Sequence, residues 1–189
     1  MFDLTIKNTM KHLYIVCFSL VAIFLLAGCD KFKEKRFSTT IPIVFEIDKA
    51  EGADLIVDME DEITALINDQ LNEVSEEIKS YELVSIEYKI WEFWGTETTT
   101  FSGSLGIGNA NATGPGVEYA FNDISIMDGS NDPAQVTMNF NSQSIDKIQQ
   151  YFLDTNGLRL FLSGQTSHAP IHFKIAIEVN IDAIAEVEK

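Results

Sequence analysis

The sequence is poor in cysteine and in positive charge. It has two cysteines among 189 residues, so a scaffold stapled by disulfides is excluded. Lysine and arginine number 13 against 29 aspartates and glutamates, which gives a formal net charge of −16. Phosphate binding needs a clustered basic surface, so this acidity argues against a nucleic-acid partner. It also argues against docking on an anionic membrane through a basic patch.

Long hydrophobic runs are scarce too, with one exception near the start of the chain. Residues 13–27 (LYIVCFSLVAIFLLA) carry no charge and follow Lys11 and His12. The run is shorter than the about 20 residues that a spanning helix needs. It has the length of the apolar region of a signal peptide, with a basic segment before it. Because no multispan pattern follows, a channel or transporter is excluded.

The apolar run ends in Leu26-Ala27-Gly28-Cys29. Small residues before a cysteine, directly after an apolar segment, resemble the lipobox of bacterial lipoproteins. In that family the cysteine thiol is acylated with diacylglycerol and a peptidase cuts the chain before the cysteine. The resemblance covers residues 10–29. It implies cleavage between Gly28 and Cys29 and a lipid anchor on Cys29.

The resemblance predicts a signal peptide over 1–28 and a charged lipidated tether over 29–38. The strand pattern of the remaining chain predicts one β-sandwich domain over 39–189. Cys17 leaves with the signal peptide and Cys29 carries lipid. The mature chain then has no thiol for catalysis or for binding zinc. We expect the protein in the bacterial cell envelope, anchored to the inner or the outer membrane through the lipid on Cys29.

From Thr39 onward the pattern is mainly that of β-strands. Apolar residues alternate with polar ones over 41–48, 84–90 and 171–182, which predicts strands with one solvated face. Pro42 places the first of these at a sheet edge, because proline cannot donate to a ladder. The last of them is expected to be central. Further strands are expected over 98–107, 117–127, 135–140 and 158–162.

Two helices are expected between the strands. Apolar residues recur at helical spacing from Ile63 to Ile78, with acids at the start, which predicts a helix over 61–79. Ser144 as a cap and Gly157 as a stop predict a second helix over 144–154. The fold class is therefore mainly β: an antiparallel β-sandwich of about seven strands with two crossover helices. The layout is similar to that of small Bacteroidota-type envelope lipoproteins of unknown function.

No motif identifies an enzyme, a cofactor site or a metal site. A G-x-S-x-G elbow is absent. Gly103, Gly106 and Gly108 stand in the wrong order for dinucleotide binding and are expected to mark a twisted or edge strand. His168 and His172 are separated by a turn, so they lose the shared face that such spacing has on a helix. We therefore predict no catalytic residues, no cofactor and no metal.

Two acidic segments also fail as ion sites. Residues 128–132 place Asp, Ser and Asp at the first positions of a calcium loop. Pro133 and Asn139 stand where that loop needs glycine and glutamate, so a turn is favoured. The acids of residues 54–62 are interpreted as a solvated helix start.

The best candidate for a binding surface is the aromatic group Trp91, Phe93 and Trp94. Alternation puts Trp91 and Phe93 on one face of an undistorted strand and Trp94 on the other. The change of parity within this strand indicates a bulge or a change of sheet. We expect at least one of the three to be exposed and to lie close to the loop 109–116. The alternative is that Trp91 and Phe93 fill the core.

The function that these observations favour is a non-catalytic one. We expect a lipid-anchored envelope lipoprotein with a binding or structural role for a protein or glycan partner. A hydrolase of envelope glycans that uses Asp/Glu pairs is the first alternative, and it requires two carboxylates that converge in a cleft. A carrier of an apolar ligand is the second, and it requires an unfilled apolar cavity.

Residues 1–9 place Asp3 where a signal peptide should be basic, so we predict that translation starts at Met10. A stop codon placed between Met1 and Met10 should leave the amount of protein unchanged on an immunoblot. Loss of the protein would show that Met1 is the start.

Overall fold

The computed structural model describes residues 32–65 and 69–188. The chain divides into two units, and residues 36–185 form the larger one. Of the smaller unit, the described residues are 32–35 and 186–188, which continue the first and last strands. Residues 1–31, with Met10, Gly28 and Cys29, lie outside the described residues. None of the described helices is long and apolar enough to cross a membrane.

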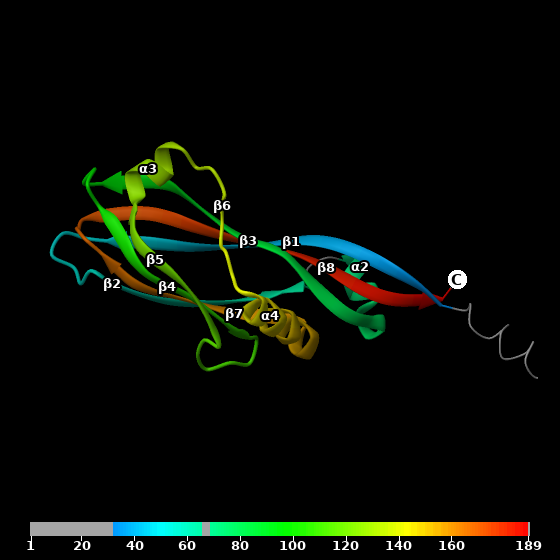
Figure 1. Cartoon of the computed structure of the whole chain (residues 1–189). Coiled ribbons are helices and arrows are strands. Elements are labelled where there is room, and N and C mark those ends of the chain that lie inside the picture. Colours follow the sequence, from blue (N-terminus) through cyan, green and yellow to red (C-terminus); the bar gives the residue numbers. More distant parts are fainter. Residues whose placement is uncertain (1–31, 66–68, 189) are drawn as a thin grey trace, which may run out of the picture. The chain divides into compact units, whose positions relative to one another are not determined.

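Within the described residues, eight strands form two four-stranded antiparallel sheets that pack against each other (Figure 1). One sheet has the order β1-β8-β3-β6 and the other β2-β7-β4-β5. This is the strand order of a double-sheet jelly roll. The strands are β1 (Phe32–Lys49), β2 (Ile56–Thr64), β3 (Ile78–Gly95), β4 (Thr100–Asn109), β5 (Val117–Ser125), β6 (Val136–Thr137), β7 (Gly157–Thr166) and β8 (Ile171–Glu188). The prediction of an antiparallel β-sandwich is confirmed.

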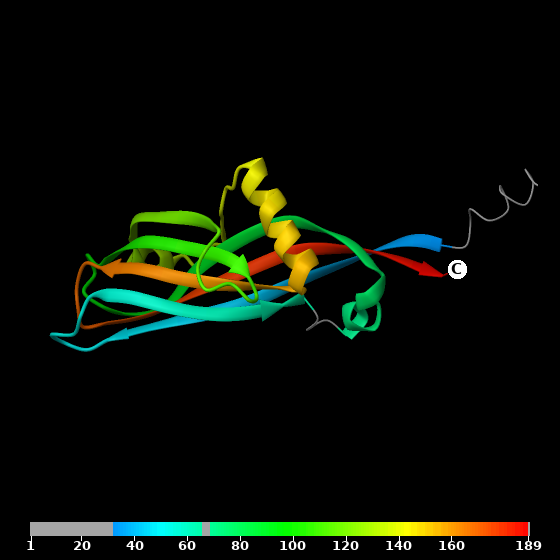
Figure 2. The same ribbon diagram turned by 90° about the horizontal axis from the view of Figure 1, so that it is seen from below.

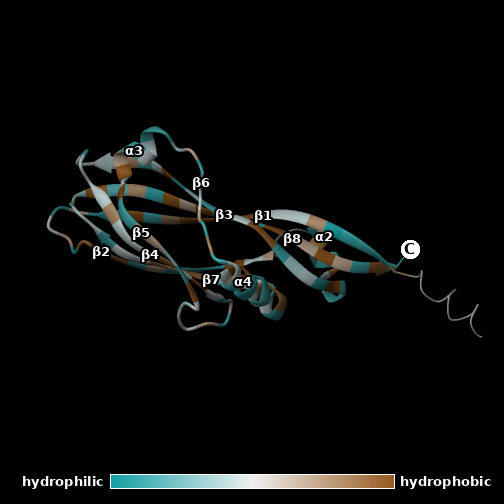
Figure 3. Ribbon diagram, viewed as in Figure 1, coloured by the Kyte–Doolittle hydropathy of each residue, from teal (hydrophilic) through white to brown (hydrophobic). Residues whose placement is uncertain are grey.

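Alternating side chains build the core between the sheets. Along β8, Ile171, Phe173, Ile175, Ile177, Val179 and Ile181 are all buried. Hydrophobic and hydrophilic residues alternate along the ribbons of Figure 3. Aromatic pairs join the two layers: the ring centroids of Tyr88 and Phe121 lie 5.3 Å apart, and those of Phe101 and Phe173 lie 6.3 Å apart. Each such buried side chain contributes about 1.5–3 kcal/mol through apolar burial.

The positions of β1 and β8 agree with the sequence pattern. β1 is an edge strand, and Pro42 is exposed on it. β8 lies between β1 and β3 and presents one polar face. The segment 32–38, expected to belong to the tether, continues strand β1 here, and Phe37 is buried.

On the side of β3 away from β8, the neighbouring strand β6 has only two residues. Side chains therefore accept two of the backbone N–H groups on this side. Ser130 accepts the N–H of Phe93 at 3.1 Å, and Gln149 accepts the N–H of Leu83 at 2.9 Å. Such caps leave fewer unpaired backbone groups for edge-to-edge association.

The predicted helix over 61–79 is wrong. Residues 56–64 form β2, which pairs with β7 in a register that places Ile63 opposite Leu158. Among the described residues that follow, α2 (Asp69–Glu73) and η2 (Ser75–Glu77) are short helices, and β3 begins at Ile78. Pairing with β7 buries Val57 and Ile63 on one face, and β-branched residues fit such a pleated surface well. This long-range pairing outweighs the local helical spacing.

The second predicted helix is confirmed as α4 (Ser142–Thr155), which carries the chain from β6 in one sheet to β7 in the other. It lies across the direction of the strands (Figure 2). The cap is Asn141, whose side chain accepts the N–H of Ser144 at 2.8 Å, and Asn156 ends the helix with φ of 54°. A further helix, α3 (Ile126–Asn131), forms where a strand end and a turn were expected.

Two glycines let β4 and β7 approach each other closely. Gly103 lies opposite Gly164, and β4 is central in its sheet, so the edge-strand interpretation of Gly103 is wrong. A Cβ on Gly103 would stand 2.1 Å from the carbonyl oxygen of Ser163. No side chain fits there unless the two backbones separate.

We expect Gly103→Ala to lower the free energy of unfolding by about 2 kcal/mol or more, because the sheet must open to admit the methyl group. Gly114→Ala is the matched control, since a Cβ there meets nothing within 4 Å. The control should change stability by less than about 0.5 kcal/mol. Urea unfolding followed by circular dichroism measures both, and equal effects would contradict the close-approach argument.

Candidate binding face

A bulge in β3 decides where the tryptophans point. Trp91 pairs with Lys174 and Trp94 pairs with His172, so β3 has one residue more than β8 between these pairs. Glu92, within the bulge, has φ of 56°. The bulge that the parity change indicated is therefore present.

The extra residue places Trp91 and Trp94 on the same face of the sheet. Residues directly opposite in an antiparallel ladder share a face, and Lys174 and His172 both belong to the polar face of β8. Opposite faces were expected only for an undistorted strand, and the bulge removes that condition. Both tryptophans project to the outer side of β1, β8 and β3, here called the outer face.

The three aromatic candidates differ in exposure. Trp94 is 63% exposed, as expected for at least one of them. Trp91 and Phe93 are half-buried. Phe93 lies inside the bulge, and its N–H donates to Ser130 of α3.

The loop 109–116 does not lie beside these aromatics. A turn in which Thr99 donates to the carbonyl of Thr96 links the end of β3 to the start of β4. The loop follows the other end of β4, about 30 Å away at about 3.3 Å per residue. The expected association of loop and aromatics is wrong, because β4 separates them.

A hollow of about 450 Å³ lies beside Trp91 on the outer face. Lys89 is 5.6 Å from the centroid of the Trp91 ring and 3.0 Å from a carboxylate oxygen of Glu178. Gln135 also donates to Glu178. The lining residues are Pro42, Val44, Lys89, Trp91, Pro133, Ala176 and Glu178. An aromatic wall with flanking charged and apolar groups suits an amphipathic ligand.

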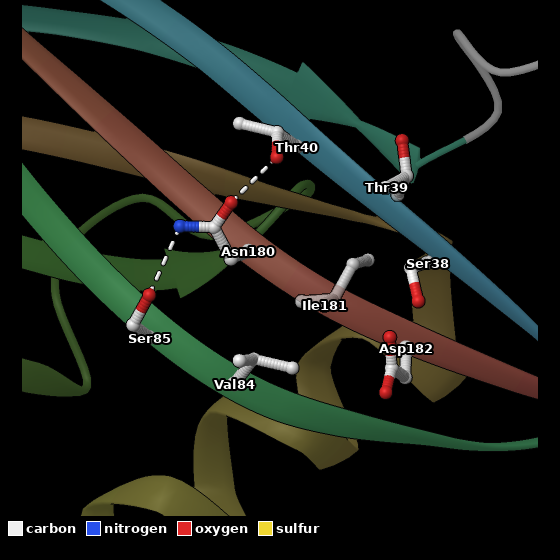
Figure 4. Close-up of a pocket in the computed structure, with 8 residues that line it drawn as sticks. All are labelled: Ser38, Thr39, Thr40, Val84, Ser85, Asn180, Ile181 and Asp182. Atoms are coloured by element: carbon white, nitrogen blue, oxygen red, sulfur yellow. Dashed lines mark hydrogen bonds between the residues drawn. The ribbon is translucent and has the colours of Figure 1, made fainter.

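A second hollow, of about 480 Å³, lies further along the same face (Figure 4). Its lining is mostly polar: Ser38, Thr39, Thr40, Val84, Ser85, Asn180, Ile181 and Asp182. A row of hydrogen bonds crosses all three strands. Thr40 donates to Asn180, Asn180 donates to Ser85 at 2.9 Å, and Ser85 donates to Glu87 at 3.1 Å.

Asp182, the next outward residue of β8 after Asn180, lines the same hollow. The Ser38 hydroxyl and the Arg36 guanidinium, 2.8 Å away, hold the pKa of Asp182 below its ordinary value. Arg36 also lies 2.7 Å from Glu82. The hydrogen bonds to Asp182 and Glu82 raise the pKa of Arg36.

Another ion pair joins β8 to the bulge of β3. Lys174 is 2.6 Å from Glu92, the residue of the bulge with positive φ. The hydrogen bond from Lys174 lowers the pKa of Glu92, and the same contact raises the pKa of Lys174. His172, next to Trp94 across the ladder, lies 3.9 Å from Glu46.

The histidines and the acidic residues that the sequence analysis considered as metal ligands do not come together in the structure. His168 lies in the loop before β8 with Nδ1 2.9 Å from the Ser167 hydroxyl, whereas His172 lies on the outer face. The acids of residues 58–62 belong to strand β2, where Glu60 pairs with Arg159 at 2.9 Å. Within residues 32–65 and 69–188 no group of three or more His, Cys, Asp or Glu side chains could hold a metal ion.

Sequence reasoning missed four residues of this face: Thr40, Ser85, Glu87 and Lys89. It also missed that Glu87 stands opposite Glu178. The alternation in β1 and β8 was the available signal, since it marks which residues point outward. It does not show which residues of β3 stand opposite them.

Comparison with known proteins finds only weak similarity. No protein-family model and no curated protein matches the chain. Solved structures of Desmodium yellow mottle tymovirus are similar at 14% identity and a TM-score of 0.40, with 85% of each chain covered. Turnip yellow mosaic virus is similar at 13% identity and a TM-score of 0.37, with 82% of this chain and 97% of that chain covered. Similarities this low carry no argument about function.

The environment of Asp182 predicts how the stability of the protein depends on pH. Its pKa is lowered in the folded chain, so its contribution to stability is present above the unfolded value of about 3.9. That contribution is lost as the pH falls through the lower folded value. We compare the free energy of unfolding of the natural chain with that of Asp182→Asn. The natural chain should be more stable by a constant amount above about pH 5, and this difference should shrink below about pH 4.

Urea unfolding over a pH series measures this difference. Asp58→Asn, an exposed position of β2, is the control for removing one negative charge. An advantage over Asp182→Asn that persists unchanged in acid would contradict the assignment.

Proposed function

We propose that this protein is a lipid-anchored lipoprotein of the bacterial cell envelope whose β-sandwich binds a protein or glycan partner without catalysis. The anchor is the lipid on Cys29, and the partner surface is the outer face around Trp91 and Trp94. The observation that supports the binding role is the pair of tryptophans brought to one side of the sheet by the bulge in β3.

The lipobox Leu26-Ala27-Gly28-Cys29 supports the anchor. The described domain begins shortly after it, with β1 starting at Phe32. A lipid on Cys29 thus holds the domain near the membrane, because few residues separate the two. Large aromatic side chains that remain accessible on a folded domain are typical of binding surfaces.

A glycan hydrolase is the second candidate, and one observation favours it. Glu87 and Glu178 stand directly opposite each other on the outer face. Glycoside hydrolysis uses such carboxylate pairs. The non-catalytic role is preferred because Glu178 is engaged by Lys89 and Gln135, and Glu87 by Ser85. A carrier of an apolar ligand would need an apolar cavity, whereas both hollows described above lie on the outer face.

We expect Cys29→Ala to abolish metabolic labelling by fatty acid and to leave an unprocessed precursor, because the thiol is the acceptor of the lipid. Cys17→Ala is the matched control and should be labelled and processed like the natural chain. Labelling is measured on the immunoprecipitated protein, and processing by its migration in gels. Labelling that survives in Cys29→Ala would refute the lipoprotein assignment.

A further inference from the structure

We propose that the outer face binds a neutral glycan chain. Trp91 and Trp94 stack on its sugar rings, and the row of Thr40, Asn180 and Ser85 hydrogen-bonds its hydroxyl groups. This inference rests on the binding role proposed above and names the class of its partner.

The two tryptophans form a stacking platform. Their ladder partners, Lys174 and His172, are two residues apart on β8, so the indoles are separated by about 7 Å along the strand. Sugar rings carry C–H groups on one face and hydroxyls at the rim. An indole offers a flat apolar surface with a polar N–H, so it complements that pattern. Trp94 is the more accessible of the two at 63% exposure.

The polar row supplies neutral hydrogen-bonding groups. Thr40, Asn180 and Ser85 come from three adjacent strands and are joined in one direction of donation (Figure 4). Each bond within the row fixes a side chain without using all its capacity. Asn180 has a second N–H, and the hydroxyls of Thr40 and Ser85 keep lone pairs. Sugar hydroxyls both donate and accept, so they match this mixed set.

The two hollows are neighbours along β8. Asn180 of the polar hollow and Glu178 of the hollow beside Trp91 are successive outward residues of β8. From His172, opposite Trp94, to Asn180 the strand spans about 26 Å. That length fits a chain of several sugar units and exceeds what a monosaccharide needs.

Charge pairing on this face favours a neutral ligand. Lys89 is paired with Glu178, Lys174 with Glu92, and Arg36 with Asp182 and Glu82. An anionic chain would have to displace these carboxylates and approach a protein of net charge −16. A cationic ligand would have to displace the bound ammonium and guanidinium groups. A neutral polyhydroxyl chain has neither cost.

The apolar groups of this face gather beside Trp91, where Pro42, Val44, Pro133 and Ala176 line the hollow. The exposed Val84 belongs to the other hollow, which is mostly polar, and the exposed Trp94 lines neither. A stable protein interface buries about 800 Å² per partner around an apolar centre. Aromatic platforms on the same face as a mostly polar hollow suit sugars better.

The test uses the full chain purified in detergent. Native gels containing β-glucan, xylan, mannan or starch show retardation when the protein binds, and tryptophan fluorescence during titration with the matching oligosaccharide gives Kd. We expect at least one neutral glycan to retard the chain. Trp91→Ala and Trp94→Ala should each weaken its binding by about tenfold or more, as for a central aromatic contact. Asn180→Ala should weaken it by about fivefold, as for the loss of one hydrogen bond.

Leu153→Ala is the matched control, because Leu153 is an exposed apolar residue of α4. It should bind like the natural chain. Thermal unfolding checks that each variant is folded, and Trp94→Ala should keep the natural melting temperature because Trp94 is largely exposed. Unchanged binding in both tryptophan variants would overturn the site.

Other outcomes overturn specific parts of the inference. If none of the four glycans binds the folded natural chain, the glycan assignment fails, whereas fatty-acid labelling of Cys29 would still stand. Stronger binding to polygalacturonate than to neutral glycans would refute the charge argument. If a purified envelope protein binds through Trp94 and no glycan binds, the partner is a protein and the glycan assignment is refuted. Release of reducing sugar that Glu87→Gln and Glu178→Gln abolish would support the hydrolase instead.

Discussion

The alternation of β8 is the constraint on which the rest of this structure depends. Its apolar residues fill the space between the sheets, and its polar residues form the middle of the outer face. Because β8 is paired on both sides, it sets the register of β1 and β3 at once. A shift of one residue would exchange the buried and the solvated side chains, so the core and the candidate site are specified together.

The bulge in β3 is a local irregularity of the strand, and it brings both tryptophans to the outer face. Without the extra residue, Trp94 would point to the face opposite that of Trp91. With it, both indoles lie on the outer face, and Lys174 of β8 pairs with Glu92 of the bulge. Positive φ at a residue other than glycine is uncommon, and Glu92 of the bulge is one of the residues that have it, with Asp123 and Asn156 elsewhere in the described chain. The bulge thus links a backbone feature to a binding proposal.

Hydrogen bonds and ion pairs keep the outer face ordered without covering it. The row from Thr40 to Glu87 ties three strands together through side chains, and the ion pairs of Arg36, Lys89 and Lys174 hold the charged residues around it. Exposed ion pairs add little stability. Their effect here is to orient side chains and to neutralise charge locally, which is what a site for an uncharged ligand requires.

The sequence by itself determined the class of fold, the central place of β8, the edge place of β1 and the helix α4, because alternation, proline chemistry and capping are local. It also predicts the lipid anchor on Cys29 from a motif that is read along the chain. The tertiary structure alone decided that residues 56–64 form β2 and that Trp91 and Trp94 share a face. Both depend on pairing with β7 and β8, whose paired residues lie roughly 80 to 110 positions away along the chain. Local patterns do not encode which residue of one strand stands opposite which of another.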